Sequence, residues 1–390
     1  MRITVLTDDR LGPVMAGSAL RAWELGRVLE AAGHEVTVCG ASGSVTPGGD
    51  GPPVSARPGR AEVVLSPPWN LPPAGFLGRA LLVLDGVTPL PAELDAMPAS
   101  PVVRRRRRTA LARLPLALAR ADAVLAAGPH QEAWWREALV RAGRPGVPVI
   151  QVPFGVPVGD PPVERDEVEG VPRDWAVVLW WGGVWPWLDL ETLLEARARL
   201  GRVPVSVVVP TAARPGGPAP GVDREALGLM AGRHGLEVPE VVAMDRWVPY
   251  AERHRLLNRA SLLVVLHHPG EEARLAFRTR ALDGVWAGVP LVVTEGGAVA
   301  DLTRERGWGA VVPAHRPKAV AAALELMLTE REQMRCRGAL AEDRESWRWS
   351  RVAAPLVELL PDLPRVPRRG LLVPGLRAAA AIAGLGGGSS

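Results

Sequence analysis

The sequence contains only two cysteines, Cys39 and Cys336, which excludes a disulfide framework and any zinc site built from clustered cysteines. Long apolar runs are also missing: no stretch of about 18 residues is free of charges or prolines, so we expect no membrane-spanning helix. At the N-terminus, Asp8 and Asp9 end the apolar run too early for a secretory signal. Together these absences favour a protein of the reducing cytoplasm.

Lysine is nearly absent. Lys318 is the only one, so 45 of the 46 basic residues are arginine, whose fork binds carboxylates and phosphates and keeps its charge. A GC-rich genome would produce the same bias. The 42 acidic residues leave a net charge of +4. Residues 1–152 carry this whole excess, with 17 arginines against 13 acidic residues.

Much of the basic excess lies in the run Arg104–Arg108. Such a run is either the solvated start of a helix or a patch that contacts an anionic membrane surface or a phosphate-bearing acceptor. The second possibility would make a cytoplasmic protein peripheral at the inner face of the membrane. No nucleic-acid partner is predicted, because no binding motif or interleaved aromatic residues accompany the run.

The chain does contain a regular alternation of short apolar runs and helix-period segments. Its 390 residues correspond to two or three domains, and 47% hydrophobic with 23% charged residues is a globular composition. The alternation predicts α/β domains with doubly wound parallel sheets. The predicted strands are 3–7, 35–39, 63–66, 80–84, 123–126, 147–152, 175–181, 203–209, 240–244, 262–266 and 289–294. The predicted helices are 18–32, 104–120, 130–142, 188–200, 223–234, 250–259, 277–287, 316–330 and 332–360.

Proline and glycine concentrate in residues 155–175, which predicts a linker. This linker separates an N-terminal domain, residues 1–154, from a C-terminal domain, residues 176–335. We expect a helix over 336–360 to cross back to the N-terminal domain, and residues 361–390, rich in proline, glycine and alanine, to form a flexible tail.

The loop after the first predicted strand carries Gly17, Ser18 and then Arg21 on the following helix. Glycine at a strand-to-helix turn lets backbone N–H groups and the positive helix end face an anion or a sugar. An ordinary turn explains the same residues. The loop is neither a dinucleotide fingerprint nor a P-loop, since no Gly-Lys pair follows.

The C-terminal domain opens with a strand that runs into Gly182 and Gly183, and Trp187 follows four residues later. The tryptophans around this turn are either core packing or the mouth of a cleft where a sugar or base lies on an indole. Asp189 is predicted to cap the next helix.

A third element, Phe277-Arg278-Thr279-Arg280, stands at the start of a predicted helix. There the free N–H groups and guanidinium forks could receive a diphosphate. Asp283 falls about one turn deeper, where a carboxylate can accept both hydroxyls of a ribose. Structural ion pairs between these arginines and nearby acids are the alternative.

With these elements the chain resembles glycosyltransferase family 4 enzymes of the GT-B fold, over roughly residues 1–360. It is similar to a bacterial subgroup that has Phe-Arg-Thr-Arg where most members have Glu-Gly-Phe-Gly. The supporting stretches are 17–29, 33–37, 120–123, 130–135, 152–156, 180–187, 247–253 and 277–290. The fold implied is two Rossmann-like doubly wound domains that face each other across a cleft.

The resemblance implies a retaining transferase that moves a hexosyl or deoxyhexosyl group from a nucleotide-diphosphate sugar to a saccharide, lipid-linked or small-molecule acceptor, in cell-envelope polysaccharide or glycoconjugate synthesis. No cofactor and no metal are implied, and the sequence has no Asp-x-Asp in a plausible cleft loop. The donor-binding residues so predicted are Gly182, Gly183, Trp187, Glu272, Arg278, Thr279, Arg280 and Asp283, and the acceptor-side residues are Gly17, Ser18 and Arg21.

The chain also departs from the family pattern. The first of two family glutamates falls at Leu275, so Glu272 is expected to serve instead, and Gly297 stands where the subgroup often has aspartate. Asp85 and His130 are the best candidates for catalytic groups. The departures leave open a second hypothesis, a GT-B protein that binds nucleotide sugars with lost or partner-dependent turnover.

Overall fold

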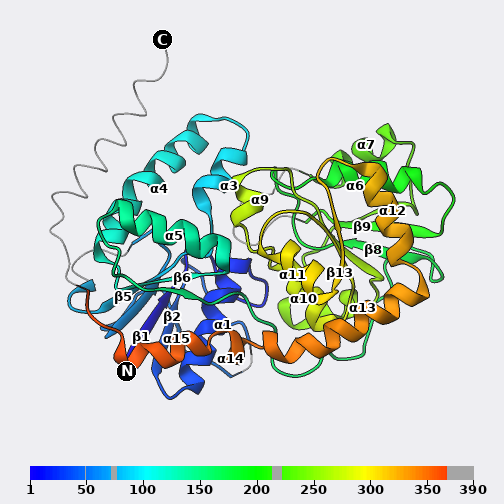
Figure 1. The fold of residues 1–390 in the computed structure, drawn as a ribbon. Coiled ribbons are helices and arrows are strands. Elements are labelled where there is room, and N and C mark those ends of the chain that lie inside the picture. The colour runs from blue at the N-terminus through cyan, green and yellow to red at the C-terminus, as the bar shows by residue number, and fades with distance from the viewer. Residues whose placement is uncertain (49, 72–76, 213–221, 367–390) are drawn as a thin grey trace, which may run out of the picture. The chain divides into compact units, whose positions relative to one another are not determined.

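The computed structural model describes residues 1–48, 50–71, 77–212 and 222–366, which form two compact units. Unit 1 consists of Met1–Phe154, Leu275–Phe277 and the described residues from Val352 onward. Unit 2 consists of Gly155–Arg274 and Arg278–Arg351. The chain therefore leaves unit 2 for three residues in the middle of its second half and again near its end. Figure 1 shows the elements of both units.

The described residues of unit 1 form a seven-stranded parallel sheet in the order β3-β2-β1-β4-β5-β6-β7. Apolar residues in short runs build each strand, and the inner strands β4 and β6 are buried throughout, as both faces of a parallel sheet must be. The strands are β1 (Arg2–Leu6), β2 (Glu35–Cys39), β3 (Val54–Ser55), β4 (Val63–Ser66), β5 (Leu81–Asp85), β6 (Ala123–Ala126) and β7 (Val149–Gln151).

Helices pack along the sheet of unit 1. Helix α1 lies against β1 and β2, while α4 and α5 share an apolar cluster with alternate residues of β4, β5 and β6, such as Val64, Leu82 and Val124. Right-handed crossovers in opposite directions from the centre of the sheet put these helices on different faces. The helices are α1 (Gly17–Ala31), α3 (Leu90–Ala96), α4 (Pro101–Arg120), α5 (Pro129–Arg141) and α15 (Ala354–Leu359).

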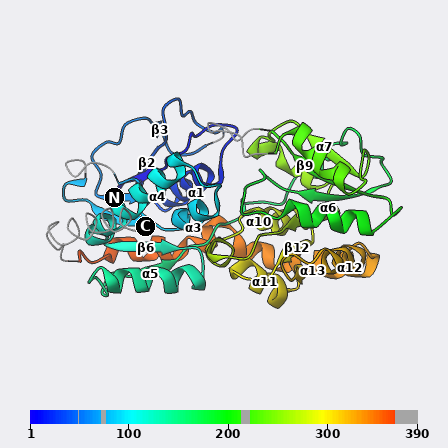
Figure 2. The ribbon, with the colours of Figure 1, turned by 90° about the horizontal axis from the view of Figure 1, so that it is seen from above.

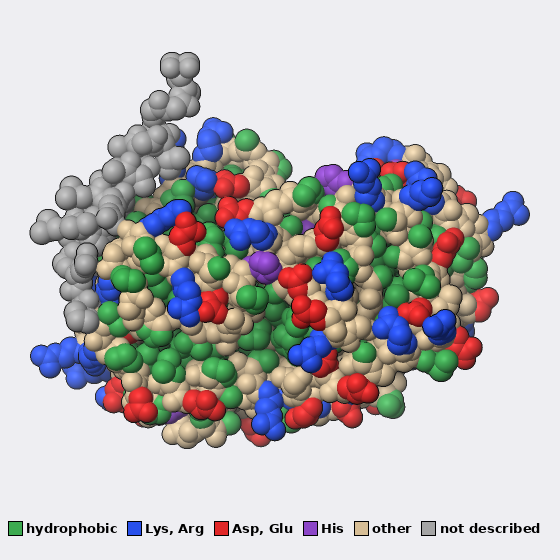
Figure 3. All heavy atoms as spheres, in the orientation of Figure 1, with side chains coloured by type: hydrophobic (Ala, Val, Ile, Leu, Met, Phe, Trp, Pro, Cys, Tyr) green, Lys and Arg blue, Asp and Glu red, His purple; other side chains and the backbone are tan. Residues whose placement is uncertain are grey.

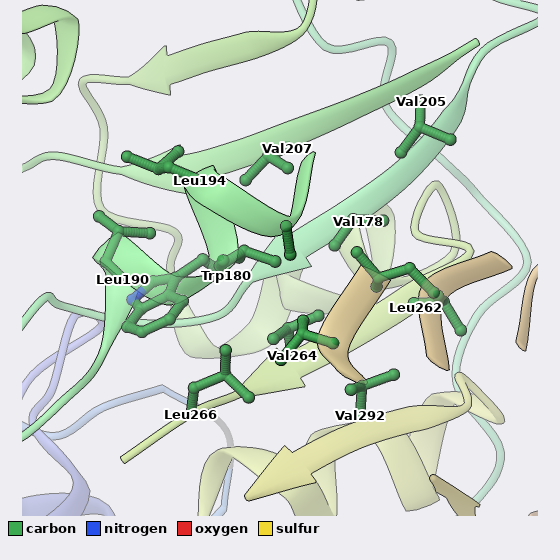
Figure 4. Close-up of a cluster of buried hydrophobic side chains, with 14 of the residues drawn as sticks. Val178, Trp180, Leu190, Leu194, Val205, Val207, Leu262, Val264, Leu266 and Val292 are labelled. Carbon is green, nitrogen blue, oxygen red and sulfur yellow. The ribbon is translucent and has the colours of Figure 1, made fainter. Parts of the chain in front are cut away.

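The described residues of unit 2 form a six-stranded parallel sheet in the order β10-β9-β8-β11-β12-β13. Alternate residues of its strands, among them Val178, Val207 and Val264, point into one apolar cluster (Figure 4). The strands are β8 (Ala176–Trp180), β9 (Val205–Pro210), β10 (Val241–Met244), β11 (Leu262–Val265), β12 (Leu291–Thr294) and β13 (Gly309–Val312).

Helices α6, α7 and α12 contribute to this cluster, and Figure 1 shows them on the side of the sheet away from α10 and α11. Figure 2 shows α6 beside α7 and β9. The carboxylate of Asp189 caps α6 as predicted, accepting a hydrogen bond from the Thr192 N–H at 3.1 Å. The helices are α6 (Leu190–Arg199), α7 (Arg224–Arg233), α8 (Arg253–Leu257), α9 (Glu271–Leu275), α10 (Arg280–Ala287), α11 (Ala298–Arg306), α12 (Pro317–Met327), α13 (Glu330–Asp343) and α14 (Trp349–Val352).

The prediction of α/β units with doubly wound parallel sheets is confirmed. Residues 155–175, predicted as a linker, belong to unit 2, where Val156 pairs with Arg348 and the Asn258 side chain donates to the carbonyl of Pro162. The single helix predicted over 332–360, which includes the segment 336–360, is divided into α13, α14 and α15.

The predicted tail 361–390 begins with packed residues: Leu363 is 7% exposed, and the Val366 N–H donates to Asp122 at 3.2 Å. Residues 367–390 lie outside the described part of the chain. Within the described residues, no helix has both the length and the hydropathy that crossing a bilayer requires.

Candidate functional site

The carboxyl end of β8 in unit 2 approaches the start of α10. Gly182, just beyond β8, has φ +88°, and a Cβ atom at this position would lie 3.4 Å from Cζ of Arg280. Both terminal nitrogens of Arg280 are 3.4 Å from the carbonyl oxygen of Gly183. Burial lowers the pKa of Arg280 to about 10, so this guanidinium is still a cation at neutral pH. Three predicted donor-binding residues thus lie together at one sheet edge.

Asp283, one turn into α10, is held by two side chains: Trp181, one of the tryptophans beside the Gly182–Gly183 turn, and Arg253, which was not predicted to belong to the site. Its Oδ2 accepts from Trp181 Nε1 at 2.7 Å, and its Oδ1 accepts from Arg253 Nε at 2.8 Å. The Arg253 guanidinium lies against the rings of Tyr250 and Trp286, at 3.7 and 4.1 Å from their centroids. Each carboxylate oxygen still has a second lone pair, and Asp283 is 24% exposed, so it can accept from a further hydroxyl.

Arg278 lies in the interior of unit 2 with 3% of its surface exposed. Its guanidinium donates to the backbone carbonyls of Thr294, Ala273, Glu295 and Gly296, the last at 2.7 Å. The side chain therefore braces the loop after β12 against α9. Arg278 and Arg280 were both predicted to bind the diphosphate. Arg278 is buried, whereas Arg280 is partly exposed to solvent.

Glu272 is also buried, and its partner is a histidine that the sequence analysis did not consider. Its Oε2 lies 2.8 Å from Nδ1 of His267, and the two side chains are 6% and 5% exposed. Burial, reinforced by the charges of Arg278 and Arg280, lowers the pKa of His267 well below its usual value, so the neutral ring donates its Nδ1–H to the carboxylate. His267 and Glu272 therefore form a buried pair just beyond the carboxyl end of β11.

Two further predicted donor-binding residues flank this cluster. Thr279 is the half-buried residue at the N-cap of α10, and its side chain makes no capping hydrogen bond. Trp187 is half-buried, and its ring stacks on Trp185 with centroids 5.1 Å apart and an interplanar angle of 3°. Both indoles pack on the core of unit 2, in line with the packing interpretation of these tryptophans.

In unit 1 the structure pairs Arg21 with Asp85. Arg21 is 2% exposed, and its Nε lies 2.9 Å from both oxygens of Asp85. Its other nitrogens donate to the carbonyls of Pro153 and Val152 at 3.0 and 2.9 Å. The predicted acceptor-side arginine thus fixes the predicted catalytic carboxylate, which remains 20% exposed at the end of β5.

The other predicted residues of unit 1 lie at the starts of helices. Gly17 is exposed at the first position of α1, and the Ser18 hydroxyl donates to a carboxylate oxygen of Asp9. His130 is half-buried in the first turn of α5.

Next to His130, the buried Gln131 anchors the segment that unit 1 takes from the second half of the chain. Its amide nitrogen donates to the carbonyls of Leu275 and Val87 at 2.7 and 2.8 Å. The ring of Phe277 stacks on Phe154 with centroids 6.4 Å apart. Leu275, which replaces a family glutamate, is therefore a buried packing residue of unit 1.

The run Arg104–Arg108 lies on α4, and four of its five residues are exposed. Arg107 is the half-buried one and forms an ion pair with Asp95. Figure 3 shows basic side chains over the part of unit 1 where α4 lies in Figure 1. Among the described residues, Asp189, His268 and His315 of unit 2 form a group of potential metal ligands.

No family model matches the chain, and no curated protein sequence does either. Several solved structures are similar to it. Sucrose-phosphate synthase from Thermosynechococcus elongatus has a TM-score of 0.66 at 16% identity, covering 93% of this chain and 99% of the other. Anabaena HepE in complex with UDP-glucose has a TM-score of 0.66 at 15% identity, covering 93% and 100%. WaaG, a glycosyltransferase involved in lipopolysaccharide biosynthesis, has a TM-score of 0.62 at 14% identity, covering 92% and 99%. The two parallel sheets and these similarities show that the chain has the GT-B fold of glycosyltransferases.

Proposed function

We propose that this protein is a retaining glycosyltransferase that moves a hexosyl or deoxyhexosyl group from a nucleotide-diphosphate sugar to an acceptor. The observation that carries the proposal is the arrangement in unit 2, where Gly182, Gly183, Arg280 and Asp283 lie together. A cation and backbone donors at a helix start suit a diphosphate, and a carboxylate one turn deeper suits a ribose.

In this proposal Arg280 and the first turn of α10 bind the diphosphate, while Asp283 accepts the ribose hydroxyls. The bond between the sugar C1 and the diphosphate oxygen breaks as a bond from C1 to the acceptor oxygen forms on the same face. Negative charge grows on the leaving diphosphate, so fixed donors there act most strongly in the transition state. The positive charge of Arg280 and the N–H groups at the start of α10 stabilise the leaving diphosphate in place of a metal ion, so in this proposal the transfer requires no metal.

We assign the acceptor to unit 1, at the start of α1 and the end of β5. Asp85 would receive the proton of the acceptor hydroxyl, with His130 as the second candidate for that role. The bonds from Arg21 fix the Asp85 carboxylate in one orientation, as a catalytic base needs. Gly17 and Ser18 would contact the acceptor at the start of α1.

The acceptor we propose is a saccharide, a lipid-linked saccharide or a small molecule, in the cytoplasm or at the inner face of the membrane. The Phe277–Arg280 motif supports membership of glycosyltransferase family 4, in the subgroup with Phe-Arg-Thr-Arg. Among the similar structures, HepE was solved in complex with UDP-glucose, and WaaG is involved in lipopolysaccharide biosynthesis. These two similarities make a UDP-sugar and a cell-envelope saccharide the first compounds to test.

The test is a panel of nucleotide sugars incubated with candidate acceptors, with release of nucleoside diphosphate and product mass as readouts. NMR of the product reports the anomeric configuration. We expect release that depends on acceptor, retained configuration and strong loss in Arg280→Ala, while Arg199→Ala, on the exposed face of α6, stays active. Inversion would contradict the retaining mechanism, and activity unchanged in Arg280→Ala would contradict the assigned donor site.

A second candidate function, binding of nucleotide sugars without turnover, is favoured by one observation. Leu275 stands where the family has a glutamate, and the structure uses it as a packing residue. Under this hypothesis a nucleotide sugar binds tightly to the pure protein, but no diphosphate is released with any acceptor or with cell extract.

A further inference from the structure

Three side chains from separate loops of unit 2 converge at the carboxyl edge of its sheet. Asp189 ends the loop between β8 and α6, His268 follows β11, and His315 lies between β13 and α12. The Asp189 side chain is 3% exposed, whereas His268 and His315 are 43% and 54% exposed. None of the three belongs to the residues proposed above to bind donor or acceptor.

One potential metal-ligating atom of each side chain faces the other two. Nδ1 of His268 lies 2.8 Å from Nε2 of His315. Oδ2 of Asp189 lies 3.9 Å from the first of these nitrogens and 3.7 Å from the second. The carboxylate is thus too far from either ring for a direct hydrogen bond, yet nearly equidistant from both.

These three distances fit a shared ion. They define a triangle with a circumradius of about 2.0 Å, so a point equidistant from the three atoms lies at the bond length of zinc to imidazole nitrogen and carboxylate oxygen. A hydrogen bond between the two imidazole rings explains only the shortest of the three distances, 2.8 Å between the two nitrogens. An ion at that point would account for all three distances, and the 43% and 54% exposed histidines make the site accessible to it.

Two local features hold the ligands in place. The Asp189 carboxylate is oriented by Thr192, whose N–H and hydroxyl donate to its two oxygens at 3.1 and 2.6 Å. Such partners orient metal-binding carboxylates. His315 has φ +53° and is, among the described residues, the non-glycine residue with positive φ. Positive φ is uncommon outside glycine, and the ring of His315 lies edge-on to that of His268, with centroids 5.0 Å apart.

We propose that Asp189, His268 and His315 bind a divalent transition-metal ion of the zinc type. Two imidazoles with one carboxylate suit zinc, nickel or copper, whereas magnesium and calcium prefer oxygen ligands. The ion ties together the loops after β8, β11 and β13, and so fixes the end of the loop that carries Gly182 and Trp187. This proposal does not depend on the glycosyltransferase activity.

The test uses the full chain without an affinity tag, stripped with a chelator and titrated calorimetrically with zinc ions alone. We expect one zinc per chain, a raised melting temperature, and no comparable response to magnesium. Cobalt(II) in place of zinc should give the intense visible absorption of a four-coordinate site. His268→Ala and His315→Asn should lose the stoichiometric binding. Asparagine tolerates the left-handed conformation, so the second variant should keep its fold.

Asp189→Asn keeps an oxygen for the cap of α6 and should weaken zinc binding at least about tenfold. His234→Ala is the matched control, because His234 pairs with the carboxylate of Glu191 at 2.8 Å but belongs to no group of three potential metal ligands among the described residues. This control should bind zinc like the wild type. The proposal is overturned if the wild-type protein binds no stoichiometric zinc, or if the double variant of His268 and His315 binds it equally well.

Discussion

Replacing Arg280 by alanine should weaken binding of the sugar nucleotide while leaving the fold stable, and replacing Arg278 should do the reverse. The two arginines are two positions apart, yet their surroundings differ. Arg280 is half-buried beside Gly182, and within the described part of the chain its hydrogen bonds are long, at 3.4 Å, and both go to the carbonyl of Gly183. Arg278 is buried and donates to four carbonyls.

The magnitudes follow from these contacts. One charge-assisted hydrogen bond to a phosphate contributes about 1.5–3 kcal/mol, so Arg280→Ala should raise the dissociation constant roughly 10- to 150-fold. Arg278→Ala leaves buried carbonyls without donors, at about 1–3 kcal/mol for each group that water cannot reach. We therefore expect a loss of about 3 kcal/mol or more in the free energy of unfolding of this variant.

The assay pairs calorimetric titration, using the nucleoside diphosphate that binds the wild type most tightly, with denaturant unfolding of both variants. Unchanged affinity in Arg280→Ala would refute the assignment of the diphosphate to the start of α10. Weak binding by a fully stable Arg278→Ala variant would show that the roles of the two arginines are reversed.

Further predictions concern pH, backbone and surface. Because the fold lowers the pKa of His267, the unfolded chain binds more protons than the folded chain below about pH 6.5. The free energy of unfolding should therefore decrease by up to about 1.4 kcal/mol for each unit by which the pH is lowered in this range. Denaturant unfolding of His267→Gln at several pH values should lack this decrease. Gly182 has φ +88°, so Gly182→Ala should lower the free energy of unfolding by about 1–2 kcal/mol and weaken binding of the nucleoside diphosphate in the calorimetric titration. Gly228→Ala is the control, because a Cβ there meets open space, and it should cause neither loss. Replacing Arg104–Arg108 with glutamine should reduce sedimentation with anionic liposomes if this run contacts membrane, and unchanged sedimentation would show a merely solvated helix face.

Local patterns in the sequence were sufficient for most of the fold. Buried parallel strands need continuous apolar runs, and these runs predicted all the central strands within one or two residues. β13 was missed because Gly309 and Ala310 give it a weak strand pattern, and its backbone is stabilised by pairing with β12. Helix α9 was missed because five residues carry too little periodicity.

The sequence by itself determined the α/β class with doubly wound parallel sheets, the Gly182–Gly183 turn and the cap at Asp189, because each depends on neighbours along the chain, whereas the GT-B fold was expected only from the family resemblance. Only the tertiary structure decided that Arg278 braces a loop while Arg280 stays partly exposed, since side-chain burial depends on elements distant in sequence. For the same reason it alone joined Asp283 to Trp181 and Arg253, and Asp189 to His268 and His315, across separations of 30 to more than 100 residues. Parallel strands end at one edge of a sheet, and that geometry, rather than any motif, brings such residues together.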